Sequence, residues 1–234
     1  MKKLSCFPFL FLAASILLLG GCERRGSSSG TLRMPIPAEN LLAKSEAYTL
    51  EQHLADLSAA YTIEVNASAK FAAYAMQAAA EGLQAVALLF EATSKSEAVH
   101  AANHQAVLEE FGATIPTVNP DFVLGSTAEN LRYAVAEEDE EVQNMYPNQI
   151  AMATKFQDEM GLQSLKYAFR SELKHKALFD AAIAAMRAGD FSTLPKAYYL
   201  CPTCGNTLTD NHHQRCEISM TFSDKFLLIN RLAI

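Results

Sequence analysis

Two copies of the pattern Glu-x-x-His are the residues of this chain best suited to chemistry. They are Glu97-Ala-Val-His100 and Glu172-Leu-Lys-His175, and further glutamates at Glu64, Glu138 and Glu141 interrupt apolar helical stretches. A buried carboxylate costs free energy unless a cation compensates its charge. Several such carboxylates on facing helices therefore predict a metal centre.

The spacing within each pattern supports this interpretation. Residues three apart in a helix differ by about 60°, so the Glu and the His of one motif point into the same space. Di-iron carboxylate bundles use one Glu from each of two helices and Glu-x-x-His from each of the other two. One such motif alone could arise by chance with a solvated glutamate. Acids on the apolar faces of four helices, in this order, favour the metal site.

The elements that must position these residues are long helices. Apolar residues recur at helical spacing from about 48 to 81, and Gly82 marks a break before a second helix that runs to about 111. Two prolines in residues 112–125 exclude a continuous helix there. This segment is long enough to connect opposite ends of a bundle.

A third helix is predicted from Ser126, which forms a capping box with Glu129, to about Met160. Gly161 is the predicted stop signal. Pro147 lies inside this helix and should bend its axis, because proline removes one backbone donor and crowds the preceding turn.

A fourth helix is predicted over 162–188, and a short Cys-containing segment begins at Pro195. Four long helices with one long crossover describe an all-α, ferritin-like four-helix bundle. The predicted domains are the bundle over 46–190 and a small module of strands and loops over 195–234.

Beyond the metal pattern, the chain resembles the rubrerythrins from about residue 47 to 229. The resemblance is carried by Glu97-Ala-Val-His100-Ala-Ala-Asn-His104, Asn130-Leu-Arg132, Glu138-Asp-Glu-Glu141, Met145-Tyr-Pro147, Glu172-Leu-Lys-His175 and Tyr198-Tyr-Leu-Cys-Pro-Thr-Cys-Gly-Asn206. It implies seven ligands for two iron ions, namely Glu64, Glu97, His100, Glu138, Glu141, Glu172 and His175. Tyr146 is predicted either to donate a hydrogen bond to a ligand carboxylate or to pack in the core.

The resemblance also implies a function. Rubrerythrins reduce hydrogen peroxide to water with two ferrous ions, and a rubredoxin-like C-terminal iron site returns the electrons. We therefore expect a non-haem di-iron peroxidase of oxidative-stress defence, and the family suggests a homodimer. The alternatives are a ferroxidase or iron-binding protein of ferritin type, which would use dioxygen, and a helical scaffold without activity.

The C-terminal module departs from the family pattern. Cys201, Cys204 and Cys216 would be three of its ligands, but Ser219 stands where the second Cys-x-x-Cys would end. Four outcomes follow: iron with a serine oxygen, zinc or iron with His212 or His213, a Cys201–Cys204 disulfide, or an empty module. If the site is lost, electrons must come from an external donor or a partner subunit.

Other polar residues receive lesser roles. His104 lies one turn beyond His100 and is either a partner of the metal ligands or a hydrogen-bonded core histidine. His53 has no acid at helical spacing and is assigned no role. Glu137, Asp139 and Glu140 are predicted to lie on the surface.

The N-terminus predicts export and anchoring. Residues 1–21 combine Lys2 and Lys3 with an apolar run, and Leu19-Gly-Gly-Cys22 resembles a bacterial lipobox. Cys22 is the predicted lipidation site, and 22–45 would form a flexible tether. The alternative is an uncleaved anchor helix, for which the apolar run is marginal. The protein is therefore predicted in the bacterial cell envelope, periplasmic or attached to the outer membrane.

The net charge disfavours nucleic acid as a partner, and none is expected. Removing residues 1–21 takes away two lysines and no acid, which leaves 26 acidic against 17 basic residues and a formal charge of −9. A surface this acidic repels phosphate backbones.

Overall fold

The computed structural model describes residues 48–232. The predicted signal peptide, the lipidation site Cys22 and the tether lie outside the described residues. Within 48–232, every helix is too short or too polar to cross a membrane.

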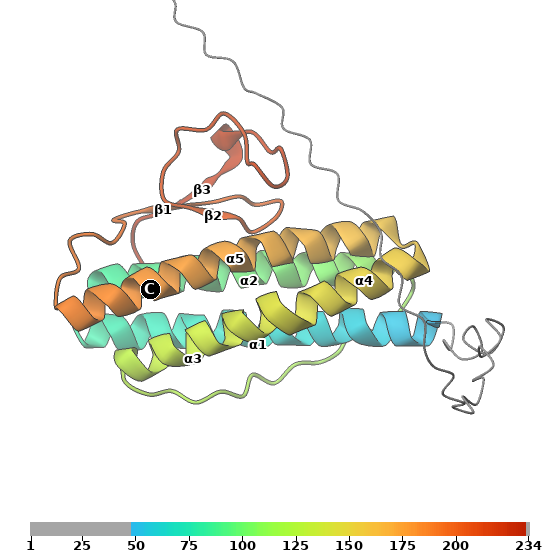
Figure 1. Ribbon diagram of the computed structural model, residues 1–234, viewed down its shortest axis with the longest axis horizontal. Coiled ribbons are helices and arrows are strands. Elements are labelled where there is room, and N and C mark those ends of the chain that lie inside the picture. Colours follow the sequence, from blue (N-terminus) through green and yellow to red (C-terminus); the bar gives the residue numbers. More distant parts are fainter. Residues whose placement is uncertain (1–47, 233–234) are drawn as a thin grey trace, which may run out of the picture. The chain divides into compact units, whose positions relative to one another are not determined.

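The described chain forms a helical bundle followed by a small sheet (Figure 1). Its elements are α1 (Leu50–Ala80), α2 (Gln84–Glu110), α3 (Thr127–Glu140), the π-helical turn η2 (Glu141–Met145), α4 (Tyr146–Phe156), α5 (Glu159–Ala188), β1 (Tyr198–Leu200), β2 (Thr207–Leu208), the 3-10 turn η3 (Ser223–Lys225) and β3 (Leu227–Ile229). The mainly helical fold with a small C-terminal sheet confirms the predicted class.

The helix ends follow local capping chemistry. Thr49 and Gln52 form a capping box at the start of α1, and Ser126 and Glu129 form the predicted box at the start of α3. The long connection between α2 and α3 runs along the outside of the bundle (Figure 1). The Tyr74 hydroxyl fastens this connection by donating to the carbonyl of Val123 at 2.7 Å.

The predicted third helix is interrupted just before Pro147. The departure from α-helical geometry is the π-helical turn η2, which directly precedes the first turn of α4. Pro147 lies in that first turn, where a missing backbone N–H needs no partner. Isolated π-turns within helices often mark functional sites, and this one begins at Glu141.

The predicted end of the third helix at Met160 and Gly161 is wrong. The helix ends at Phe156, Gln157 adopts a left-handed φ of 63°, and Asp158 caps α5 by accepting from the Met160 N–H at 3.1 Å. Gly161 lies inside α5, where a side chain would collide with Asp158. The glycine therefore serves packing beneath the cap and does not stop a helix.

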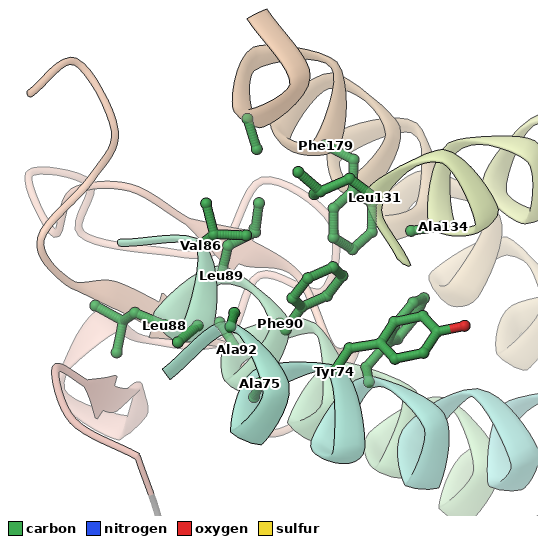
Figure 2. Packing of buried hydrophobic residues seen from close by; sticks show 14 of the residues in the cluster. Tyr74, Ala75, Val86, Leu88, Leu89, Phe90, Ala92, Leu131, Ala134 and Phe179 are labelled. Carbon is green, nitrogen blue, oxygen red and sulfur yellow. The ribbon is translucent and has the colours of Figure 1, made fainter. Parts of the chain in front are cut away.

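Two apolar clusters hold the bundle together, one toward each end. Figure 2 shows the larger cluster, in which Tyr74, Phe90 and Phe179 converge from α1, α2 and α5. The ring centroids of Phe90 lie 5.4 Å from those of Tyr74 and of Phe179. The smaller cluster includes Leu57 of α1 and Leu165 of α5.

The C-terminal module is a three-stranded antiparallel sheet of order β2-β1-β3. It lies over α2 and α5 (Figure 1), and its strands contact both helices. Buried residues of β1 and β3, including Tyr198 and Ile229, join the larger apolar cluster. The module is therefore packed against the bundle and shares its core.

Candidate metal centre

A polar layer separates the two apolar clusters on every long helix. On α1, Glu64 follows Leu57 of the smaller cluster and precedes Phe71 of the larger one. The order along the chain is the same on α5, and it is reversed on α2 and along α3 to α4, where the larger cluster comes first. The helices thus bring the predicted ligands to one level of the bundle interior.

Six of the seven predicted ligands converge there as two groups of four. One group consists of Glu64, Glu97, His100 and Glu172, and the other of Glu97, Glu138, Glu172 and His175. Within each group, the ligand atoms lie within 4.8 Å of one another. Glu97 and Glu172 belong to both groups, so the two carboxylates can bridge two cations.

The distances show this bridging arrangement. The two carboxylate oxygens of Glu172 lie 2.8 Å from His100 Nδ1 and 2.6 Å from His175 Nδ1. Those of Glu97 lie 2.9 Å and 3.2 Å from the same two nitrogens. Each acid of a Glu-x-x-His motif therefore faces the histidine of its own helix and that of the other helix.

The donor set fits metal ions because many of its buried atoms have no hydrogen-bond partner within residues 48–232. These atoms are Glu64 Oε2, both carboxylate oxygens of Glu97, Glu138 Oε2, Glu172 Oε1 and both ring nitrogens of His100. Most buried polar groups in proteins are paired. Oxygen and nitrogen atoms whose lone pairs face one another without forming hydrogen bonds are expected where these atoms bind the same cation.

Electrostatics give the same picture. Burial raises the pKa of Glu64 to about 7 and the pKa of Glu138 and of Glu141 well above the usual range. Burial alone would lower the pKa of His175, but the adjacent carboxylates raise it to about 10. Without metal the layer therefore holds protons, and bound metal would replace them.

Glu141 and Lys70 lie beside the two groups. Glu141 is buried, but the structure does not bring it into either group of four. The Lys70 ammonium is buried and forms an ion pair with Glu137. The prediction that Glu137 is a surface residue is therefore wrong, since it is partly buried and has a cationic partner. No sequence pattern singled out Lys70, because its ion pair joins two helices that are far apart in the chain.

Tyr146 and His104 support the layer from the side of the smaller cluster. The Tyr146 hydroxyl donates to Glu64 Oε1, and His104 Nε2 lies 3.3 Å from the same hydroxyl. His104 Nδ1 lies 2.8 Å from the Ser164 hydroxyl, and burial lowers the pKa of His104 to about 3. A neutral histidine is thus linked to a ligand carboxylate through one tyrosine.

The outer side of both ligand histidines is covered by the C-terminal module. His175 Nε2 lies 3.1 Å from the Thr207 hydroxyl, and the Gly205 carbonyl accepts from Ser96 at 2.5 Å and from Ser171 at 3.1 Å. A Cβ on Gly205 would lie 2.6 Å from His100 Cδ2, so only glycine allows this approach. Sequence spacing could not reveal these contacts, which join segments far apart in the chain.

The three C-terminal cysteines form a separate buried cluster. Cys201, Cys204 and Cys216 have free thiols whose sulfur atoms lie within 4.8 Å of one another. The predicted alternative of a Cys201–Cys204 disulfide therefore does not match the structure. His212 and His213 are exposed and do not belong to the cluster.

One buried pair was missed at the far end of the bundle. His53 Nε2 lies 2.8 Å from Asp158 Oδ2, and both side chains are almost completely buried. These residues are separated by 105 positions in sequence, so no helical spacing could signal the pair. The absence of an acid at helical spacing from His53 therefore did not exclude a remote acid partner.

Comparisons with known proteins agree with this geometry. The family model described as Rubrerythrin matches residues 56–183, more than half of the chain. Rubrerythrin-2 of Clostridium acetobutylicum is 33% identical over 140 residues, which are 59% of this chain and 75% of the relative. Rubrerythrin of Porphyromonas gingivalis is 32% identical over 137 residues, or 56% of this chain and 66% of the relative.

Solved structures extend the likeness into the C-terminal module. Nigerythrin in its fully reduced, all-ferrous state has a TM-score of 0.68 and 28% identity, and the match covers 80% of this chain and 91% of nigerythrin. An open-pore ferritin from Archaeoglobus fulgidus has a TM-score of 0.52 at 14% identity, with 61% of this chain and 89% of the ferritin covered, and shows the fold alone.

Four helices that direct shared carboxylates and two histidines into one interior layer define a ferritin-like di-iron carboxylate protein. The chain belongs to the rubrerythrin family. Family membership implies two iron ions, and the six converging residues are the donors that would hold them.

Proposed function

We propose that this protein is a non-haem di-iron peroxidase that reduces hydrogen peroxide to water in oxidative-stress defence. The observation that carries the proposal is the pair of four-ligand groups that share Glu97 and Glu172. Reducing one peroxide to two water molecules takes two electrons and two protons, and two bound ferrous ions would supply one electron each.

The protein's own residues prepare the layer for this chemistry. Tyr146 holds Glu64 by donating to its carboxylate, and His104 in turn orients the tyrosine. The apolar clusters above and below exclude bulk water, which strengthens the electrostatic interactions inside the layer.

We propose an external electron donor as the source of the electrons that restore the ferrous state. The module is a suitable entry point, because Gly205 and Thr207 lie against the outer edges of His100 and His175. Cys204 directly precedes Gly205 in the chain. An electron that reaches the cysteine cluster therefore needs to cross only a short stretch of packed atoms.

Anaerobic single-turnover oxidation tests the peroxidase proposal. Protein loaded with two ferrous ions per chain should turn ferric on addition of about one equivalent of hydrogen peroxide, followed by absorption spectroscopy. Glu97→Ala should abolish the reaction by removing a shared ligand, whereas Glu140→Ala, on the exposed side of α3, should not change it. Retention of both ferrous ions after peroxide addition would refute the proposal.

A parallel reaction with dioxygen distinguishes a peroxidase from the alternative function, a ferroxidase of ferritin type. The same reduced protein is mixed with oxygenated buffer at matched oxidant concentration. A peroxidase should react faster with peroxide, whereas a ferroxidase of ferritin type should react faster with dioxygen and accept further ferrous ions.

We further propose that the protein is tethered to the bacterial envelope through lipid on Cys22. The support is the sequence Leu19-Gly-Gly-Cys22 and the charged, apolar segment before it. Cells that produce the full chain should incorporate labelled fatty acid into it and retain it with membranes. Cys22→Ser should lose the label, and unchanged labelling would contradict the assignment.

We also propose a homodimer, as the family resemblance suggests. Sedimentation equilibrium of the protein without its signal segment should give about twice the chain mass. A monomer at micromolar concentration would contradict this proposal.

A further inference from the structure

We propose that the C-terminal module binds one transition-metal ion, iron or zinc, through Cys201, Cys204, Cys216 and the hydroxyl oxygen of Ser219. This inference does not rest on the peroxidase reaction. It concerns whether Ser219 abolishes the metal site or supplies its fourth ligand.

The module contains two turns with the same backbone hydrogen bonds. In the first turn, the Gly205 N–H donates to the Cys201 carbonyl at 3.0 Å, and the Cys201 N–H donates to the Asn206 carbonyl at 3.0 Å. In the second turn, the Met220 N–H donates to the Cys216 carbonyl at 2.9 Å, and the Cys216 N–H donates to the Thr221 carbonyl at 2.7 Å. The two turns are therefore equivalent, residue for residue.

The equivalence extends to an unusual backbone conformation. Gly205 has a φ of 76° and Met220, at the matching position, has a φ of 61°. A left-handed conformation is ordinary for glycine but costs free energy for methionine. The second turn therefore keeps the geometry of a ligand-bearing turn despite this cost. In the second turn, Ser219 takes the position that Cys204 has in the first turn.

The side-chain atoms lie close enough to share one metal ion. Ser219 Oγ lies 3.3 Å from Cys201 Sγ, and Cys204 Sγ lies 3.5 Å from Cys216 Sγ. In a tetrahedral site with metal–sulfur bonds of about 2.3 Å, neighbouring ligand atoms lie about 3.8 Å apart. A modest expansion of the cluster would therefore accommodate the ion.

Polar hydrogens point at the cluster as they would at a thiolate. The Ile218 N–H donates to Cys216 Sγ at 3.4 Å, and the Asn206 amide donates to the same sulfur at 3.5 Å. The Asn206 side chain is completely buried. Hydrogen bonds of this kind stabilise negative charge on sulfur, which metal binding requires.

Ser219 is free to turn its oxygen toward the ion. Its hydroxyl lies 2.9 Å from the Thr221 hydroxyl, which itself donates to Thr203 at 2.8 Å. Because the Thr221 hydroxyl proton is used toward Thr203, the Ser219 proton goes to the Thr221 hydroxyl. The Ser219 oxygen accepts from the Thr221 N–H at 3.5 Å and keeps its other lone pair for the cluster. Three thiolates suit iron and zinc, and both ions also accept an oxygen donor.

Metal loading of the full chain tests the proposal. Anaerobic protein is loaded with ferrous ion alone or with zinc alone, and metal content and reactive thiols are counted before and after a chelator. We expect one metal beyond those of the bundle and protection of three thiols, which the chelator reverses. Competition between the two metals then identifies the preferred ion.

Variants of Ser219 decide whether its oxygen is a ligand. Ser219→Ala should weaken binding of the additional metal at least about tenfold, whereas Ser223→Ala, another serine of the module, should not change it. Ser219→Cys should keep the metal and bind it more tightly, with added thiolate absorption in the ferric form. This second variant keeps the test valid if Ser219→Ala fails to fold.

Two results would overturn the proposal. One is equal affinity for the additional metal in the wild-type protein and in Ser219→Ala. The other is full reactivity of Cys201, Cys204 and Cys216 in the metal-loaded wild-type protein together with an additional metal only in Ser219→Cys. Failure of the bundle irons to react with peroxide would leave these measurements unaffected, so the two proposals fail separately.

Discussion

Replacement of Gly205 by alanine tests the packing of the C-terminal module on the metal layer. The new methyl group would lie 2.6 Å from His100 Cδ2 and 2.8 Å from the Ser96 hydroxyl, closer than van der Waals contact allows. Neither neighbour has room to move, since both are completely buried. The φ of 76° adds a second cost, because alanine avoids the left-handed region.

The expected loss of stability combines these two costs. A left-handed alanine costs about 1–2 kcal/mol, and overpacking a buried site costs about 1–3 kcal/mol. The sum of about 2–5 kcal/mol should lower the Tm of a domain of this size by on the order of 10 °C. Displacement of His100 should also reduce iron content.

Gly189 provides the matched control. It caps α5 with a φ of 66°, but no atom of the described part of the chain lies within 4 Å of the position where its Cβ would be. Gly189→Ala should therefore lose only the conformational part, about 1–2 kcal/mol, and keep its iron. Thermal unfolding and metal analysis of both variants separate the two costs. Equal Tm values and equal iron content would refute the inferred contact between Gly205 and His100.

Three further predictions concern the metal layer itself. Glu138→Ala should lower iron content from about two ions per chain to about one, while Glu140→Ala should not, as measured by atomic absorption; unchanged content in both variants would argue for a scaffold. The metal-free protein should lose stability as pH rises from 4.5 to about 7, because burial raises the pKa of Glu64 to about 7 and the folded state keeps a proton that the unfolded chain has released. The raised pKa of His175, about 10, should extend this loss of stability above pH 6.5. Calorimetry of chelator-treated protein measures the Tm across this pH range, and a Tm that rises with pH would contradict the prediction. Lys70→Met should shift the midpoint potential of the iron pair to more negative values, because a nearby positive charge favours the ferrous state; an unchanged potential in a redox titration would exclude this role.

Local signals in the sequence predicted the helices and most of the residues that converge in the polar layer. A Glu and a His three residues apart must share a helix face, and an acid within an apolar stripe must face the interior. These relations depend on helix geometry alone. For that reason the sequence alone pairs Glu97 with His100 and Glu172 with His175.

The breaks between helices were harder to predict. Glycine is the residue type that commonly ends a helix, as predicted at Gly161. The chain instead turns at Gln157, a residue type that seldom adopts a left-handed conformation. The buried pair of His53 and Asp158 accompanies this turn. Because His53 is remote in sequence from this turn, local propensity could not reveal the contact that stabilises the turn.

The sequence by itself determined which residue types reach the interior of the bundle, because the period of the helix converts spacing into direction. Only the tertiary structure decided which carboxylates are shared, that Glu141 stands outside both groups, and that Gly205 and Thr207 cover the ligand histidines. Those relations depend on the register of one helix against another and on the docking of the module. Register and docking are set by packing between segments far apart in the chain, and such packing has no local signature.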